Sequence, residues 1–164
     1  MNFFDFFRGL NDRQLDYVVI GGVALVMHGV VRMTADLDLM VAMERGNLQK
    51  LIDVMTGLGY RPRIPEPATA LLDPEKRKYW REKKHMEVFS FYAPDNPLAL
   101  VDIMIYEPVS YPLIRQHAVT MKLGSIAVPV ASIDDLIALK KISARPQDLE
   151  DIKSLEELKR HGQP

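Results

Sequence analysis

Apolar residues along the chain follow helical and strand periods in turn. The first segment, residues 3–15, places Phe3, Phe6, Phe7 and Leu10 at helical spacing and predicts an amphipathic helix. Further helices are predicted over residues 21–28, 47–58, 73–84, 133–143 and 147–160. Apolar runs predict strands at Tyr17–Ile20, Leu37–Val41, His85–Tyr92, Ala99–Tyr106 and Ile126–Val130. This order predicts an α/β (α+β) fold, with a central mixed sheet flanked by helices and a helical pair at its C-terminal end.

Capping and turn residues set the ends of several elements. Asp73 is expected to be an N-cap with Pro74 at the first helical position, and Ser132 begins a capping-box-like helix start. Three prolines make residues 61–72 largely irregular, and residues 93–97 join two antiparallel strands. No repeat or linker interrupts the 164 residues, so a single domain over 1–164 is predicted.

Three aspartates stand in apolar surroundings. Asp36 and Asp38 are two positions apart at the start of strand Leu37–Val41, so both project from the same face. Asp102 is the only charged residue in the apolar segment Leu100–Ile105. Carboxylates packed together repel one another unless a cation lies between them, and such oxygen ligands suit Mg²⁺ or Mn²⁺.

A pair of aspartates at this spacing is common in turns and on solvated faces. Here the flanking residues are apolar, and burying unpaired carboxylates costs several kcal/mol each. That cost favours a metal-binding function for all three acids. It also predicts that the strands containing Asp38 and Asp102 lie side by side, with the carboxylates within a few ångströms of one another.

Gly21-Gly22 lies between the strand Tyr17–Ile20 and the helix that follows it. A glycine turn at this place exposes backbone N–H groups at the positive end of a helix, where a phosphate group can bind. A phosphate site beside metal-binding carboxylates indicates metal-assisted phosphoryl or nucleotidyl transfer.

Composition narrows the class of protein. The net charge of −1 argues against a protein built to coat nucleic acid, and the absence of cysteine excludes disulfides and thiolate chemistry. The first eight residues lack the features of a signal peptide, and no segment approaches the roughly 18 apolar residues of a membrane span. A cytoplasmic protein without membrane contact is expected.

The motifs together resemble those of a known family. Gly21-Gly22, Asp36-Leu37-Asp38-Leu39 and Val101-Asp102-Ile103 resemble the three-part signature of the DNA polymerase β-type nucleotidyltransferase superfamily. The segment Arg32-Met33-Thr34-Ala35-Asp36 and the late segments 133–140 and 145–152 are similar to the minimal nucleotidyltransferases that include AbiEii-type toxins. The resemblance runs from about residue 17 to 155. Nothing is recognised between residues 61 and 98, where substrate choice is expected to be decided.

The resemblance implies a nucleotidyltransferase fold and a metal-dependent mechanism. Two Mg²⁺ ions would be held by Asp36 and Asp38, and Asp102 would complete the site and accept the proton of the acceptor hydroxyl. Gly21 and Gly22 would bind the triphosphate of an NTP substrate through their amides. Many relatives carry serine at the position of Gly22, so this chain lacks one hydroxyl contact to phosphate.

Three further residues are candidates for substrate binding. Arg32 either binds a phosphate or is an ordinary surface arginine, and Thr34 either binds substrate or simply begins the strand. Lys140 lies near the buried face of its helix, where a lysine needs an anion. A phosphate or a carboxylate meets that need, and we assign Lys140 to the nucleotide phosphates. Lys141 is expected to be solvated.

Other charged residues are interpreted as structural. Arg145, Asp148 and Asp151 are expected to form an ion-pair and capping network at the junction of the last two helices. The four histidines show no spacing typical of a metal or catalytic cluster.

Three functions fit these features. The first is transfer of a nucleotide to a hydroxyl of an acceptor such as tRNA, by a toxin with an antitoxin protein as partner. The second is transfer to a small molecule such as an antibiotic. The third is non-catalytic binding of a nucleotide or a partner protein, against which the three intact acids count.

The basic run 76–84, with Tyr79 and Trp80 for stacking, is an ordinary solvated helix face or a surface for RNA. An acidic acceptor cleft would favour a cationic antibiotic.

Overall fold

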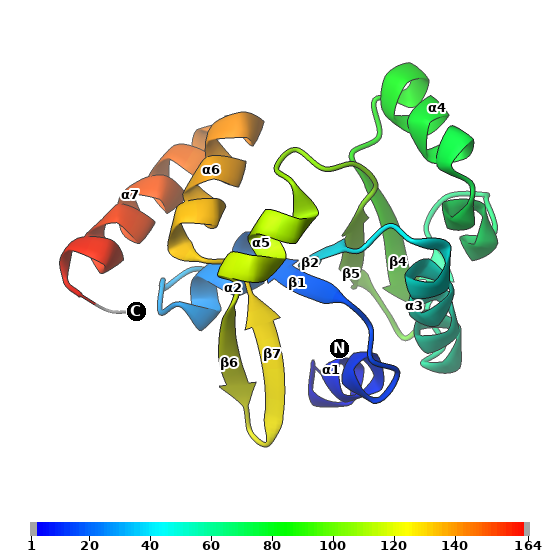
Figure 1. Ribbon diagram of the computed structural model, residues 1–164, viewed down its shortest axis with the longest axis horizontal. Helices are drawn as coiled ribbons and strands as arrows, with labels where there is room; N and C mark the ends of the chain where they lie inside the picture. Colours follow the sequence, from blue (N-terminus) through cyan, green and yellow to red (C-terminus); the bar gives the residue numbers. More distant parts are fainter. Residues whose placement is uncertain (1–2, 163–164) are drawn as a thin grey trace.

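A mixed β-sheet forms the centre of the protein (Figure 1). The computed structural model describes residues 3–162, so the first and last two residues of the predicted domain lie outside it. Within that range the sheet has seven strands in the order β3-β4-β5-β2-β1-β7-β6. They are β1 (Tyr17–Ile20), β2 (Leu37–Val41), β3 (Arg61–Pro62), β4 (Val88–Ala93), β5 (Asn96–Met104), β6 (Val119–Leu123) and β7 (Ile126–Val130). The predicted α/β class and central mixed sheet are confirmed.

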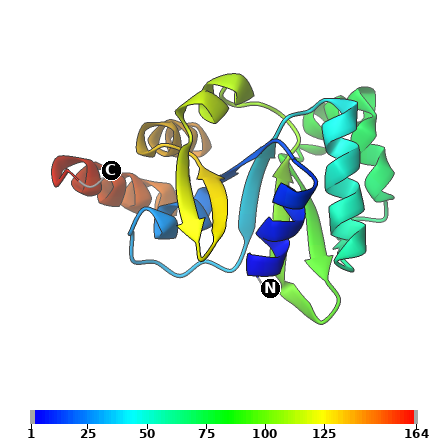
Figure 2. The same cartoon turned by 60° about the horizontal axis from the view of Figure 1, so that its bottom comes forward.

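The helices flank this sheet at both ends (Figures 1 and 2). They are α1 (Phe3–Asp12), α2 (Gly21–Met27), α3 (Arg45–Gly57), η1 (Ala68–Leu72, a 3₁₀ helix), α4 (Pro74–Lys84), α5 (Tyr111–His117), α6 (Ile133–Ser143) and α7 (Pro146–Arg160). Helices α6 and α7 pack against each other, which confirms the predicted C-terminal pair. Helices α3 and α4 both contact η1 at the opposite end of the sheet. No helix in the described part of the chain is long and apolar enough to cross a membrane.

The order of the central strands brings distant parts of the sequence together. Strand β2 pairs antiparallel with β1 and parallel with β5, and β1 pairs parallel with β7. Strands β4 and β5 form an antiparallel hairpin, as do β6 and β7. The predicted adjacency of the strands that contain Asp38 and Asp102 is therefore confirmed.

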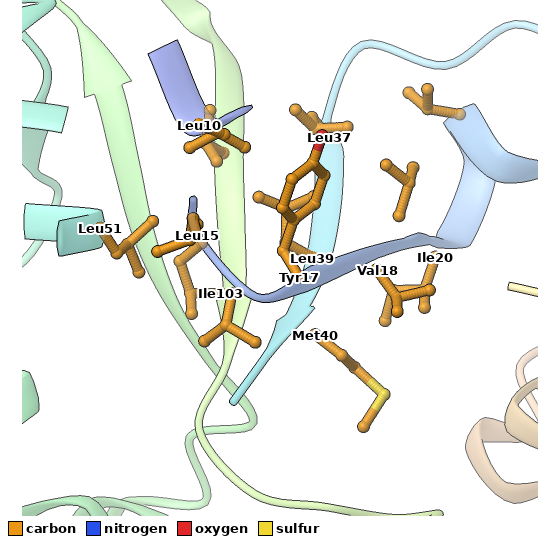
Figure 3. Close-up of a cluster of buried hydrophobic side chains, with 14 of the residues drawn as sticks. Leu10, Leu15, Tyr17, Val18, Ile20, Leu37, Leu39, Met40, Leu51 and Ile103 are labelled. Atoms are coloured by element: carbon orange, nitrogen blue, oxygen red, sulfur yellow. The ribbon is translucent and has the colours of Figure 1, made fainter. Parts of the chain in front are cut away.

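Alternation along the strands gives the sheet two different faces. Leu37, Leu39 and Ile103 lie on the face covered by α1 and α3, together with Leu10 and Leu51 of those helices (Figure 3). The intervening residues of β1 and β2, such as Ile20 and Met40, project from the opposite face. Asp38 shares this second face, because it is two positions from Met40. Apolar residues are thus buried on both sides of β2, and Asp38 is the one acid within the strand.

Some elements differ from the sequence prediction. Helix α1 ends at Asp12 rather than residue 15, because Gln14 has a positive φ of 51°. Residues 61–72, expected to be irregular, contain the two-residue strand β3 and η1. Strand β4 begins at Val88 rather than residue 85, because His85 ends α4 in a left-handed conformation with φ of 53°. Helix α5 and strand β6 were not predicted.

Candidate active site

Asp38 and Asp102 open into a cavity of about 430 Å³ on the sheet face opposite α1 and α3. Helix α6 forms one wall, while α4 and the ends of β4 and β5 form another, and Figure 1 shows α6 at the upper left and α4 at the upper right. The polar and charged side chains that line it are Asp38, Arg81, Glu87, Asp102, Tyr106, Lys140, Ser143 and Arg145. This cavity therefore contains two of the three predicted acids.

The register of the sheet brings the acids together. Asp38 and Asp102 are direct partners on the parallel strands β2 and β5, so their side chains leave the sheet side by side. Asp36 lies just before β2, and its Oδ1 accepts a hydrogen bond from the backbone N–H of Leu100 at 3.2 Å. It is therefore tied to the backbone of β5, two residues from Asp102.

The pKa values of Asp38 and Asp102 are both raised in this site. Burial, together with the charges of Asp102 and Asp36, raises the pKa of Asp38 from 3.8 to about 7 against the lowering effects of Arg145 and the Gly22 N–H. Burial also raises the pKa of Asp102, although a hydrogen bond from Ser90 lowers it. Oδ1 of Asp102 is buried and has no hydrogen-bond partner among residues 3–162. A buried acceptor among like charges fits a cation.

A divalent metal ion suits this set of oxygen atoms. Carboxylates are the ligands that Mg²⁺ and Mn²⁺ prefer, and the unpaired Oδ1 of Asp102 faces the same region as Asp38. Within residues 3–162 no three acidic or histidine side chains are already arranged as a complete ligand group. Asp36, Asp38 and Asp102 could hold such an ion, with Asp36 leaving its bond to Leu100 N–H.

Gly21 makes room for the Asp38 carboxylate. Its φ is +65°, and a Cβ at this position would lie 2.0 Å from Oδ2 of Asp38. A larger residue would therefore be both strained and in collision with the acid. The N–H of Gly22 donates a hydrogen bond to Asp38, which lowers the pKa of that carboxyl against the larger effect of burial. The glycine turn and the acid thus form one unit.

Arg32 and Thr34 lie beside Gly22. A Cβ on Gly22 would lie 2.5 Å from Oγ1 of Thr34 and 3.3 Å from Cζ of Arg32. Oγ1 of Thr34 contacts the backbone oxygen of Asp36 at 3.4 Å. Arg32 donates from Nη1 to Oδ2 of Asp151 at 2.6 Å, so it is not a free surface arginine. Both predicted residues are at the glycine turn, and their contact with substrate stays a prediction.

Lys140 finds its anion within the protein. Its ammonium is buried and lies 2.9 Å from Oδ1 of Asp148 and 2.6 Å from Oδ2 of Asp151. The need for an anion, from which a phosphate contact was inferred, is therefore met by two carboxylates of α7. Lys140 still borders the cavity. Its direct contact with nucleotide phosphates stays a prediction.

The network predicted at the α6–α7 junction is confirmed. Oδ2 of Asp148 accepts hydrogen bonds from the backbone N–H and Nε of Arg145, each at 3.0 Å, and from Ser143 at 2.7 Å. Burial alone would raise the pKa of Asp148, but these bonds and Lys140 outweigh it and hold the pKa well below its usual range. Arg145 also lines the cavity, and its charge acts on Asp38. The network therefore borders the acids.

Sequence reasoning missed the side chains on the α4 wall. Arg81, Glu87 and Tyr106 line the cavity with the acids, and Tyr106 shares a face of the chain with Asp102 by alternate spacing. That spacing was the available signal. Trp80, considered as a stacking surface, is instead 3% exposed and packs against Phe89. Trp80, the buried residue of this basic helix, therefore packs α4 against the core.

Solved structures with this fold include antibiotic-modifying enzymes. The lincosamide antibiotic adenylyltransferase LnuA, lincomycin-bound, superposes with a TM-score of 0.59 at 14% identity, over 91% of this chain and 90% of that one. ANT(2")-Ia in complex with adenylyl-2"-tobramycin gives 0.60 at 14% identity, over 96% and 90%. An antigenic nucleotidyltransferase-like protein from Paracoccidioides brasiliensis gives 0.55 at 18% identity, over 93% and 72%. At these identities the likeness shows the fold.

The sequence itself matches a family model. The comparison with curated proteins gives no match. The family described as "Nucleotidyl transferase AbiEii toxin, Type IV TA system" matches residues 7–160, nearly the whole chain. The resemblance inferred from the three motifs is thereby confirmed. The chain belongs to the AbiEii nucleotidyltransferase family and is a nucleotidyltransferase.

Proposed function

We propose that this enzyme moves a nucleotide from an NTP to a hydroxyl group of an RNA such as tRNA, with Mg²⁺ or Mn²⁺ held by Asp36, Asp38 and Asp102. The observation that carries the proposal is the pairing of Asp38 with Asp102 on neighbouring strands, where burial and mutual repulsion raise the pKa of Asp38 to about 7. Such an arrangement gains stability when a cation is bound.

The reaction needs no covalent intermediate. The acceptor oxygen attacks the α-phosphorus, the bond to pyrophosphate breaks, and the hydroxyl proton passes to the carboxylate of Asp102. Divalent metal at the three acids would supply charge neutralisation for the triphosphate and the attacking oxygen. Gly21 and Gly22 hold the triphosphate through backbone amides at the start of α2, and Arg32 and Thr34 contact it from beside the turn.

The charges of the cavity favour RNA over a cationic antibiotic as acceptor. In the described part of the chain, Glu87 is the single carboxylate lining the cavity besides Asp38 and Asp102, and Arg81 lies 3.6 Å from it. Arg81 balances the charge of Glu87, and Arg145 adds a cation on the α6 side, so the lining outside Asp38 and Asp102 is not the acidic cleft that a cationic antibiotic would favour. LnuA and ANT(2")-Ia, whose structures contain antibiotics, make a small molecule the alternative acceptor.

Membership of the AbiEii family supports a toxin role. A toxin that adds nucleotides to tRNA would block translation, and an antitoxin protein would be its partner. A reaction between NTP and tRNA would take place in the cytoplasm. Arrest of growth on expression of the wild-type enzyme, absent with Asp38→Asn, would support this role, whereas normal growth with both would reject it.

The proposed activity is tested by incubating the enzyme with Mg²⁺, each labelled NTP and either total cellular RNA or an RNA-free extract. We expect label in the RNA fraction with the wild type, and at least a thousandfold less with Asp38→Asn, because that change removes a charge at the metal site. Asp53→Asn, which alters an exposed acid of α3, should leave the activity unchanged.

Metal binding is followed separately by thermal unfolding. Mg²⁺ or Mn²⁺ with NTP should raise the melting temperature of the wild type through mass action, and should not raise that of Asp38→Asn. Label confined to small molecules would reject the RNA acceptor and favour the antibiotic alternative. Equal thermal shifts in the two proteins would argue that the acids do not bind metal.

A further inference from the structure

A cluster of three side chains lies on the α4 wall of the cavity, away from the glycine turn. The guanidinium of Arg81 lies over the ring of Tyr106, with Cζ 4.0 Å from the ring centroid. Glu87 holds both residues, 3.6 Å from Nη1 of Arg81 and 3.4 Å from the hydroxyl of Tyr106. The Arg81 side chain is 38% exposed, so this pair is open to solvent rather than part of the core.

The cluster lies close to Asp102 in the sequence and lines the same cavity. Asp102, Met104 and Tyr106 occupy alternate positions, and all three line the cavity. At about 3.3 Å per residue, Tyr106 lies at most about 13 Å from Asp102. An acceptor with its hydroxyl at Asp102 would therefore meet Arg81 and Tyr106 with the part of the molecule beyond its reacting unit.

The same pair borders a second depression, on the other side of the cavity rim. Arg81 and Tyr106 line both, and the second is formed largely by α4, with Arg77 and Lys78 among its charged residues. Lys78 is exposed, whereas Arg77 donates to the backbone oxygen of Leu71. A chain leaving the acids over Tyr106 thus continues onto the basic face of α4.

We propose that Arg81 and Tyr106 form an acceptor subsite, on which a base of the RNA next to its reacting end stacks, while Lys78 in the second depression holds an adjoining phosphate. This rests on the proposed function and specifies how its acceptor is held. Stacked aromatic and guanidinium groups accept any base, because every base has a π face. Glu87 keeps the Arg81 side chain in place, so little ordering is required on binding.

Other groups on α4 do not offer such a platform. Trp80 is buried against Phe89. Tyr79 is 50% exposed, yet it lines neither depression, and its nearest cation is Lys84 with Nζ 6.0 Å from the ring centroid. Tyr79 and Lys84 therefore provide matched controls for loss of a ring and loss of a charge on the same helix.

The test measures binding of a short fluorescent single-stranded oligoribonucleotide, and the KM and kcat for labelling of total cellular RNA. Tyr106→Ala and Arg81→Ala should each weaken oligonucleotide binding roughly five- to a hundredfold, the range for loss of one stacked base. The KM for RNA should rise while kcat at saturating RNA and the affinity for Mg²⁺-NTP stay unchanged. Tyr106→Phe, which keeps the ring, should bind nearly as the wild type does.

Tyr79→Ala and Lys84→Ala should stay within about twofold of the wild type. If Tyr106→Ala and Arg81→Ala behave like these controls, the subsite is rejected while the nucleotidyltransferase activity stands. If the wild type neither binds nor labels RNA, the RNA acceptor itself is rejected, and the subsite with it. The Arg81 side chain is partly exposed, so Arg81→Ala is expected to fold. It therefore still tests the subsite if Tyr106→Ala unfolds.

Discussion

At the scale of single residues, the glycine turn makes room for groups that come from other elements. Gly21 is required by its positive φ and by the Asp38 carboxylate beside it. Gly22 is required by the side chain of Thr34, whose hydroxyl lies 2.5 Å from where a Cβ would stand. Thr34 thereby brings a hydroxyl group to the glycine turn.

The raised pKa of Asp38 predicts how stability depends on pH without metal. A carboxyl whose pKa rises from 3.8 to about 7 on folding stabilises the protein below pH 4, and that contribution is lost as pH rises through about 7. For this one group the change amounts to about 4 kcal/mol. In EDTA, the free energy of unfolding from urea titrations should therefore fall between pH 4 and pH 7.

The pH effect has a clear control. Asp38→Asn removes the titrating group and should flatten the curve, while Asp53→Asn should keep the wild-type slope. Addition of Mg²⁺ should restore stability at pH 7, because the ionised carboxylates then have a cation. An Asp38→Asn curve as steep as the wild-type curve would show that other groups cause the dependence.

At the scale of elements, the helix caps were predicted correctly, whereas a strand that depends on pairing was missed. Asp73 and Ser132 cap α4 and α6 as predicted, accepting hydrogen bonds from backbone N–H groups two or three residues along. Such caps depend only on nearby residues. Strand β6 is mostly exposed at the edge of the sheet, so it lacks the apolar alternation by which a strand is recognised. Its existence depends on pairing with β7.

Lys140 connects α6 to α7 through two ion pairs, so its removal should lower the stability of the protein. Lys140→Ala leaves Asp148 and Asp151 buried without their shared cation, and loss of one partner of a buried pair costs about 3–5 kcal/mol. We therefore expect a large drop in the free energy of unfolding. Lys141→Ala, at an exposed position, should be nearly silent in the same urea titration.

Nucleotide affinity measured on the same variants separates the two roles of Lys140. If Lys140→Ala is destabilised but binds Mg²⁺-NTP as Lys141→Ala does, the lysine is structural. Weakened binding at a temperature where the variant is fully folded would support its predicted contact with phosphate.

At the scale of the whole molecule, the sheet order decides which sequence signals meet. Asp36, Asp38 and Asp102 could be predicted to converge, because buried charges in apolar strands have few other arrangements. The positions of Arg81 and Tyr106 at the cavity could not be predicted from sequence. They depend on where α4 lies, which is set by a tertiary contact, the packing of Trp80 against Phe89. The pairing of the strands that contain Asp38 and Asp102 could therefore be predicted from sequence, whereas the side chains on the α4 wall of the cavity could not.

One ion pair connects the loop before β2 with helix α7. Arg32, in the loop before β2, and Asp151, in α7, are 119 residues apart in sequence and 2.6 Å apart in space. A double-mutant cycle with Arg32→Ala and Asp151→Asn should give a coupling energy of roughly 1–3 kcal/mol. The same cycle between Arg8 and Asp5, an exposed pair, should give less than about 1 kcal/mol. Additive effects of Arg32 and Asp151 would show that the pair does not couple loop and helix.

The shared carboxylate of Asp151 also bears on the order of folding. Arg32 and Lys140 both form ion pairs with Asp151, so the loop before the acids acquires its tertiary partner only after α7 has been synthesised. Contacts of such long sequence separation close late, since the loop entropy must be overcome first. A partly made chain can pair β1 with β2 and so hold Asp38, yet it lacks the helix that orders Arg32. The loop that contains Arg32 is therefore expected to acquire its final order together with α7, at the last stage of folding rather than with the strands beside it.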